Sequence, residues 1–214
     1  MEQGEAAAKA REGYDQMAQV YADHVAFELT VPSLVRSALE TFAHQVDQLG
    51  SGAVADVGCG PGHVTAFLAG LGLDIVGIDI AAELLSIART AHPEVRFELG
   101  QLASLPIEAG ALQALVSKHS LIHTPPELVA PVLAEFQRVL APGGLLYLSF
   151  FGAADPSSHG LAFDHAVTTA YQLDVEAMAK LLRDAGFIED LRIVQQPGEH
   201  ERQLPHGTFF ARRR

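Results

Sequence analysis

Short apolar segments typical of buried β-strands alternate with segments of helical periodicity along most of this chain. The strand-like segments lie at residues 53–57, 75–78, 95–99 and 112–117, and apolar residues at helical spacing follow most of them. In a parallel sheet each crossover helix packs on one face, so strands and helices alternate in the sequence. The alternation therefore predicts an α/β protein with helices on both faces of a mostly parallel sheet.

The N-terminal residues precede this alternation. Residues 6–28 have the pattern of a polar helix with scattered aromatic residues. Pro32 suits the first turn of a second helix, which Gly50 ends. We therefore expect a helical cap over residues 1–50 beside a core over residues 51–214, the two forming one compact domain.

The C-terminal half contains the strongest strand signal. A helix predicted to begin at Pro125-Pro126 ends at Pro142-Gly143-Gly144, and the apolar run at 145–151 predicts a buried strand. Residues 152–172 are loop-rich, and we expect this insertion to arch over a functional site. The predicted sheet is completed by two late strands, at about 188–195 and 207–212.

Composition limits the possible partners and compartments. Asp and Glu outnumber Lys and Arg by 26 to 14, for a net charge of −12, which opposes binding to nucleic acids. The single cysteine excludes an internal disulfide and fits a reducing compartment. No apolar stretch reaches about 18 residues, and the N-terminus lacks a secretory pattern. We expect a cytoplasmic protein without a membrane or nucleic-acid partner.

The segment with the clearest chemical signal is Asp56-Val57-Gly58-Cys59-Gly60-Pro61-Gly62, between the first strand and a helix. Its glycines let a ligand approach the main chain, and the helix N-terminus offers free N–H donors. Asp79 ends the second strand, where a carboxylate can accept hydrogen bonds from both hydroxyls of a ribose. A dinucleotide fingerprint would need a glycine at His63, so the spacing disfavours a nicotinamide cofactor.

Together with Leu140-Ala141-Pro142-Gly143-Gly144 before an apolar strand, these segments make the chain resemble the class I S-adenosylmethionine-dependent methyltransferases, most strongly over residues 53–151. The resemblance implies a Rossmann-like, doubly wound, seven-stranded sheet whose last strand is antiparallel. It also implies transfer of a methyl group to a small-molecule acceptor, with release of S-adenosylhomocysteine. That displacement needs positioning and desolvation rather than a metal, and we predict no metal site.

The resemblance assigns residues to the cofactor. The glycine loop contacts its methionine part, with Asp56 orienting the loop or the amino group. Asp79 holds the ribose, and Gln101 stands where the family commonly has an acidic residue. The residues expected to contact the cofactor are Tyr14, Tyr21, Asp56, Gly58, Cys59, Gly60, Gly62, Asp79, Ile80, Gln101, Leu102 and His119.

Histidines are the candidates for proton transfer, because a hydroxyl acceptor benefits from a general base. His123 is the first candidate, and His119 and His165 are further candidates. The residues expected to contact the acceptor are His123, His165, Tyr171 and His206. For each of them a structural role stays open, and Lys118 is expected to be a solvated charge.

Two other functions stay open. A nicotinamide-dependent oxidoreductase uses the same kind of sheet, and a non-catalytic S-adenosylmethionine-binding protein would keep the loop without a productive pocket.

Overall fold

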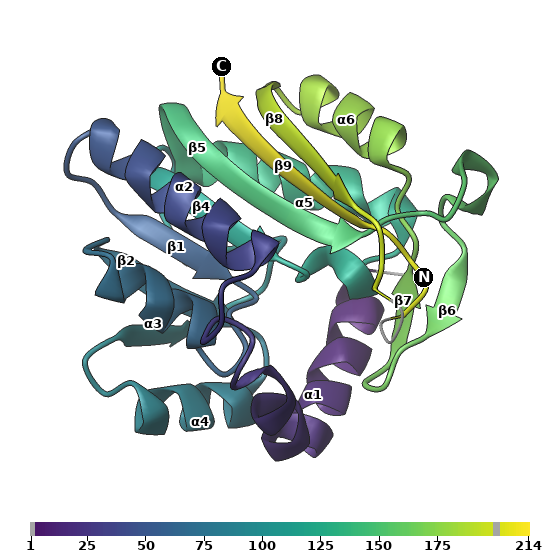
Figure 1. Ribbon diagram of the computed structural model, residues 1–214, viewed down its shortest axis with the longest axis horizontal. Helices are drawn as coiled ribbons and strands as arrows, with labels where there is room; N and C mark the ends of the chain where they lie inside the picture. The colour runs from purple at the N-terminus through teal and green to yellow at the C-terminus, as the bar shows by residue number, and fades with distance from the viewer. Residues whose placement is uncertain (1–2, 199–201) are drawn as a thin grey trace.

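The computed structural model describes residues 3–198 and 202–214, and a seven-stranded sheet lies at its centre (Figure 1). Its strands are β1 (Val54–Val57), β2 (Ile75–Asp79), β3 (Arg96–Leu99), β4 (Leu112–Lys118), β5 (Leu140–Phe151), β8 (Phe187–Gln195) and β9 (His206–Arg213). Their order across the sheet is β3-β2-β1-β4-β5-β9-β8. Strands β1 to β5 pair in parallel, whereas β9 is antiparallel to both of its neighbours, which confirms the predicted topology.

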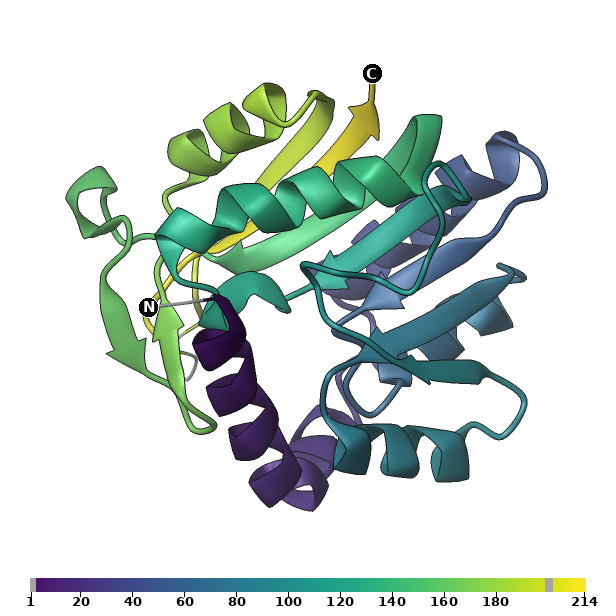
Figure 2. The same cartoon turned by 180° about the vertical axis from the view of Figure 1, so that it is seen from behind.

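Helices cover both faces of the sheet, as predicted (Figures 1 and 2). The helices are α1 (Gln3–Val25), α2 (Leu34–Gln48), α3 (His63–Gly70), α4 (Ala82–Ala91), α5 (Pro126–Val139) and α6 (Val175–Asp184). Apolar residues of α2 and α3 form one core with the sheet, centred on Phe42 and Tyr147. Those of α5 and α6 form the other, which includes Phe136, Phe150 and Phe209. Because both faces are buried, the centre of β4 at residues 114–116 and the centre of β5 at residues 145–148 are apolar.

The boundary between α5 and β5 differs from the prediction. The helix ends at Val139 and the strand begins at Leu140, so Pro142-Gly143-Gly144 lies inside the strand instead of ending the helix. Leu112 pairs with Leu140, and the register then shifts so that Ala114 pairs with Leu145. The strand therefore carries extra residues as an irregularity, which Gly143 accommodates with its positive φ of 78°.

The start of α2 also differs from the prediction. Pro32 precedes the helix, and Ser33 is the N-cap, whose hydroxyl oxygen accepts a hydrogen bond from the N–H of Arg36. A serine can satisfy a free N–H of the first turn, whereas proline has no side-chain acceptor, so the cap position goes to Ser33.

Helix α1 stands apart from the helices that cover the sheet. Both views place it beyond the carboxyl ends of the central strands (Figures 1 and 2). Ala18 of α1 packs with Ala81 and Leu84 at the start of α4. The first helix therefore lies over the edge of the sheet where the glycine loop and Asp79 are found.

The insertion contains regular structure, contrary to the expectation of a loop. Residues 152–172 include a short 3₁₀ helix, η2 (Pro156–Ser158), and a hairpin of β6 (Ala162–Asp164) and β7 (Thr169–Tyr171). The hairpin packs beside α1, so closely that a Cβ atom on Gly13 would lie 2.7 Å from the carbonyl oxygen of Val167. Among the described residues, no helix has the length and apolar character needed to cross a membrane.

Candidate functional site

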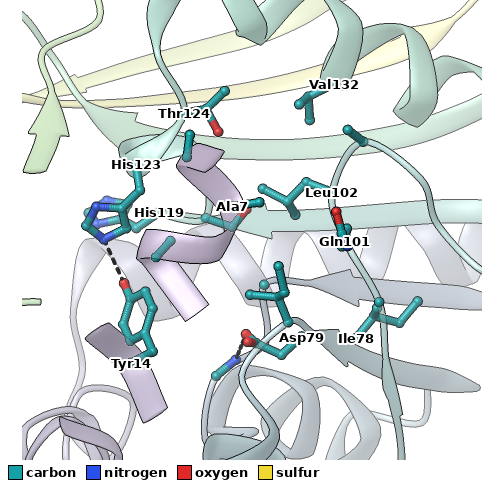
Figure 3. Close-up of a pocket in the computed structure, with 18 of the residues that line it drawn as sticks. Ala7, Tyr14, Ile78, Asp79, Gln101, Leu102, His119, His123, Thr124 and Val132 are labelled. Atoms are coloured by element: carbon teal, nitrogen blue, oxygen red, sulfur yellow. Dashed lines mark hydrogen bonds between the residues drawn. The ribbon is translucent and has the colours of Figure 1, made fainter. Parts of the chain in front are cut away.

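A pocket with about 960 Å³ of empty volume, counting its open mouth, lies between α1 and the carboxyl ends of β1, β2 and β4 (Figure 3). The short 3₁₀ helix η1 (Leu121–His123) and the start of α5 close another side. Segments distant in the sequence thus meet at one edge of the sheet, where ligands bind in open α/β folds. The predicted site residues that line it are Tyr14, Tyr21, Gly58, Gly60, Asp79, Ile80, Gln101, Leu102, His119 and His123.

The glycine loop offers bare main chain to this pocket. Gly58 has a φ of 75°, and a Cβ atom there would lie 2.2 Å from the Cβ of Ser120. Gly60 has a φ of 55° and also lines the pocket. Gly62 instead caps α3, and a Cβ atom on it would meet the ring of Phe97 at 2.6 Å. The first two glycines therefore face the ligand space, and the third permits close packing behind it.

Asp79 is buried at the end of β2 and tied to the loop. One carboxylate oxygen accepts a hydrogen bond from the N–H of Gly60 and the other from the N–H of Ala81, each at 2.8 Å. Burial raises the pKa of Asp79, while these backbone hydrogen bonds oppose the rise. A carboxylate has about four acceptor positions, so Asp79 can still accept a hydrogen bond from a ligand hydroxyl.

Asp56 and Cys59 support the loop from behind and do not line the pocket. The hydroxyl of Thr65 donates to Asp56 at 2.7 Å, and burial raises the pKa of this carboxyl to about 7. The Cys59 side chain packs with Leu85 and Phe97, and burial raises the pKa of its thiol well above the usual value. Of the two sequence interpretations of Asp56, this geometry supports orientation of the loop.

His123 has both ring nitrogens in hydrogen bonds. Nδ1 lies 2.8 Å from the carbonyl oxygen of Thr169, and Nε2 lies 3.1 Å from the hydroxyl of Tyr14 (Figure 3). Because a carbonyl can only accept, Nδ1 carries the proton in the neutral ring and Nε2 accepts from Tyr14. Burial lowers the pKa of His123, opposed by the bond to Thr169. The neutral imidazole therefore uses its one lone pair, on Nε2, to accept the hydroxyl of Tyr14 at the pocket wall.

His119 follows β4 with a positive φ, a backbone conformation that is unusual for a residue other than glycine. Its φ is 55°, and its ring stacks on that of His206 with 5.1 Å between centroids. Nε2 of His119 lies 3.3 Å from Nδ1 of His206, and burial lowers the pKa of His119 well below the usual value. Strained backbone of this kind occurs often at functional sites.

The remaining predicted acceptor residues lie outside the pocket lining. The His165 ring lies 5.1 Å from that of His123, and burial lowers its pKa to about 4. His206 supports His119, and Tyr171 lies on β7. His165 and His206 therefore contact the two pocket histidines without being part of the described pocket lining.

Lys118 contradicts the expectation of a solvated charge. Its side chain is 11% exposed, it lines the pocket, and its ammonium lies 2.6 Å from Glu28. Glu28 also interacts with His63, at 3.0 Å. No sequence spacing connects these residues, because they come from three separate elements. The pocket wall also includes small and apolar residues that the sequence patterns did not single out, namely Ala6, Ala7, Ala10, Leu128 and Val132.

The pocket fits S-adenosylmethionine. Gly58 and Gly60 present main chain without a side chain to the pocket, and a Cβ on Gly58 would collide with Ser120 of the same wall. Asp79 offers acceptors for ribose hydroxyls, and Ile80 and Gln101 supply an apolar surface and an amide for the base.

Comparison with known proteins supports this assignment. Residues 54–144 match the family model described as a methyltransferase domain. Trans-aconitate 2-methyltransferase of Rhizobium meliloti is 34% identical over 129 residues, which are 59% of this chain and 49% of that protein. Demethylmenaquinone methyltransferase of Chlorobaculum tepidum is 28% identical over 158 residues, 63% of this chain and 64% of that protein. The chain thus spans about half to two thirds of these relatives.

Solved structures share the fold. The 1,6-didemethyltoxoflavin-N1-methyltransferase of Burkholderia thailandensis, crystallised with 1,6-didemethyltoxoflavin and S-adenosylhomocysteine, matches with a TM-score of 0.74 and 22% identity. That match covers 100% of this chain and 91% of the other. The [4+2]-cyclase SpnF matches with a TM-score of 0.70 and 18% identity, over 93% of this chain and 96% of the other. The family match over residues 54–144, the glycine loop and Asp79 together support a class I S-adenosylmethionine-dependent methyltransferase domain in this chain.

Proposed function

We propose that this protein transfers the methyl group of S-adenosylmethionine to a small, uncharged acceptor and releases S-adenosylhomocysteine. The observation that carries the proposal is a single pocket that joins the glycine loop and Asp79 to the Tyr14–His123 pair. One part can hold an adenosyl ligand, and the other can hold a nucleophile and take its proton.

Two contributions of the protein follow from this arrangement. Helix α1 covers the pocket with Ala6, Ala7, Ala10 and Tyr14, so it acts as a cap that excludes water. The hairpin at 162–171 packs against α1 and supplies the Thr169 carbonyl that orients His123. The cofactor itself supplies an activated methyl group, and the protein supplies alignment, exclusion of water and a proton acceptor.

His123 is the proposed proton acceptor. Its Nε2 lone pair accepts the Tyr14 hydroxyl, so Tyr14 passes its proton to Nε2 as it takes up the proton of the acceptor, and the bond from Nδ1 to Thr169 stabilises the imidazolium that forms. His119 is proposed to contact the cofactor or the acceptor at the pocket wall, with His206 behind it. His165 contacts the His123 ring from outside the described lining of the pocket.

The charge of the wall argues for an uncharged acceptor. Among the described residues that line the pocket, Lys118 is the one basic side chain other than the two histidines, and it is paired with Glu28, so the wall offers a single cation. Burial keeps His119 and His123 neutral by lowering their pKa values. A polycarboxylate needs several cationic partners when it leaves water. The name of the Rhizobium relative specifies trans-aconitate, and we do not extend that acceptor to this chain.

The test is a methylation assay with the purified protein, S-adenosylmethionine and a panel of small phenols, N-heterocycles, thiols and carboxylic acids, with S-adenosylhomocysteine measured as the product. Turnover with an uncharged member is expected, and a preference for trans-aconitate would contradict the proposed acceptor class. Tight binding of S-adenosylmethionine without turnover on any member would favour a binding protein or another reaction. Such an outcome is compatible with this fold, since the structural neighbour SpnF is a cyclase. Binding of NADH instead would favour the oxidoreductase alternative. The absence of nucleic-acid partners and the cytoplasmic location stay predictions from composition.

A further inference from the structure

A partly buried ionic cluster lies at the end of β4 beside the pocket. The ammonium of Lys118 lies 2.6 Å from one carboxylate oxygen of Glu28, and Nε2 of His63 lies 3.0 Å from the other. The Lys118 side chain is only 11% exposed and lines the pocket with Gly58 and Tyr21. The cluster therefore places a cation in the wall next to the glycine loop.

The cluster holds the ammonium in place and leaves part of it available. A carboxylate only accepts, so His63 and Lys118 both donate to Glu28. Burial by itself raises the pKa of Glu28, but the hydrogen bonds and charges of His63 and Lys118 outweigh it, and the pKa is lowered. Glu28 is therefore ionised and fixes Lys118. The ammonium has three N–H groups, and the bond to Glu28 uses one of them.

The ligand chemistry complementary to this cation is a carboxylate. S-adenosylmethionine and its product carry one on their amino-acid group, at the opposite end from the adenine. Gln101 lies on one side of the pocket and His119, the chain neighbour of Lys118, lies on the other (Figure 3). A molecule with its base near Gln101 and its sulfur near Gly58 therefore points its amino-acid group toward the cluster.

We propose that Lys118 binds the carboxylate of the cofactor's amino-acid group and that Glu28 is the positioning residue that holds the ammonium at the wall. This assignment rests on the proposed function, because it takes the ligand to be S-adenosylmethionine. It gives Lys118 a role in selecting cofactors that keep the amino-acid group over adenosine derivatives that lack it.

The test compares two ligands by calorimetry, S-adenosylhomocysteine and 5′-methylthioadenosine, which lacks the amino-acid group. Lys118→Met is expected to weaken binding of S-adenosylhomocysteine by about 10- to 100-fold, the usual effect of losing a hydrogen bond to a charged group. Binding of 5′-methylthioadenosine is expected to stay unchanged, which also shows that the variant is folded. Lys118→Arg retains a cation and is expected to recover most of the lost affinity.

Further variants keep the test decisive. Lys118→Met leaves the Glu28 carboxylate without its ammonium partner, which can prevent folding. The double variant Glu28→Gln with Lys118→Met removes both charges and is expected to show the same ligand-selective loss. Glu28→Gln alone is expected to weaken S-adenosylhomocysteine binding less than Lys118→Met does. Stronger binding would show that Glu28 competes with the ligand and would overturn its positioning role.

The outcomes separate this inference from the proposed function. Equal loss of affinity for both ligands, or an unchanged affinity for S-adenosylhomocysteine in Lys118→Met, overturns the role of Lys118 while the cofactor assignment stands. Failure of the unaltered protein to bind either ligand overturns the proposed function itself.

Discussion

The hydroxyl of Tyr14 and Nε2 of His123 lie 3.1 Å apart, although 109 residues separate them in the chain. The bond joins the covering helix α1 to η1 behind β4. It links closure of the pocket to the orientation of the proposed proton acceptor. The rings also meet edge to face, with 5.4 Å between centroids, so the contact has both polar and apolar parts.

Replacing His123 is expected to impair the chemical step. His123→Gln removes the base, so kcat on an acceptor found by the methylation panel is expected to fall by about 10²- to 10⁴-fold. The affinity for S-adenosylhomocysteine, measured by calorimetry, is expected to stay unchanged. His165→Gln is the matched control, because His165 contacts the His123 ring without lining the pocket. Normal turnover in His123→Gln would exclude this residue as the base.

The pH dependence of the unaltered enzyme tests the same assignment. Burial lowers the pKa of His123 below its usual 6.5, so the ring stays neutral through pH 7. We therefore expect kcat/KM to stay level on going down from pH 8 to pH 6.5 and to decline only at lower pH, as the base becomes protonated. A decline that begins above pH 7 would contradict a neutral, buried His123.

Asp79→Asn is expected to weaken cofactor binding. The amide has one acceptor oxygen, whereas both oxygens of Asp79 accept backbone N–H groups. Affinity for S-adenosylhomocysteine is expected to fall by about 10- to 100-fold, measured by calorimetry. Asp74→Asn, at an exposed carboxylate just before the other end of β2, is the control. Equal affinities in the two variants would refute the role of Asp79 in binding the ribose.

Gly58→Ala tests the close approach of the loop to Ser120. The added Cβ meets Ser120 and occupies a positive φ, a strain of about 1–3 kcal/mol before the clash is counted. Gly50→Ala is the control, since Gly50 has a φ of 95° but open space around its Cβ position. Thermal unfolding is expected to show the larger loss in Gly58→Ala, with reduced cofactor affinity in that variant alone. Similar losses would mean that backbone strain, and not contact with Ser120, sets the requirement for glycine.

The buried carboxyl of Asp56 is expected to make stability depend on pH. Its pKa is raised by burial from 3.8 to about 7, so the folded state binds a proton more tightly than the unfolded state. The resulting stability is complete below about pH 4 and is lost as the pH rises toward 7. Asp56→Asn mimics the neutral form and lacks this loss. The quantity to compare is the melting temperature of Asp56→Asn minus that of the unaltered protein. We expect this difference to be a few degrees larger at pH 8 than at pH 5, because 1 kcal/mol corresponds to about 2–4 °C in a chain of this size.

Circular dichroism at the two pH values measures this difference, and Asp47→Asn, at an exposed carboxylate, is its control. A difference between Asp56→Asn and the unaltered protein that does not change with pH would show that Asp56 is already ionised in the folded state.

Local sequence patterns determined most of the fold. Apolar runs define the strands because a sheet covered on both faces buries both sides of its strands, as the centres of β4 and β5 show. The glycine loop and Asp79 were identifiable because each depends on one short segment with its own signal. Patterns misplaced the start of β5, where Gly143 sits inside the strand, since a glycine permits a helix end and a strand irregularity equally.

Tertiary structure alone decided which side chains form the wall of the pocket. The partners of His123, Tyr14 and Thr169, lie 109 and 46 residues away, and Glu28 joins Lys118 and His63 from other elements. Such contacts leave no periodic trace, because they depend on where entire elements pack and on which groups lose water when they do. Packing also reversed the expectation for Lys118, whose side chain is largely shielded and paired with Glu28 instead of solvated. The chain's pattern thus specifies the sheet and its ligand-binding edge, while packing sets the charge and proton chemistry found there.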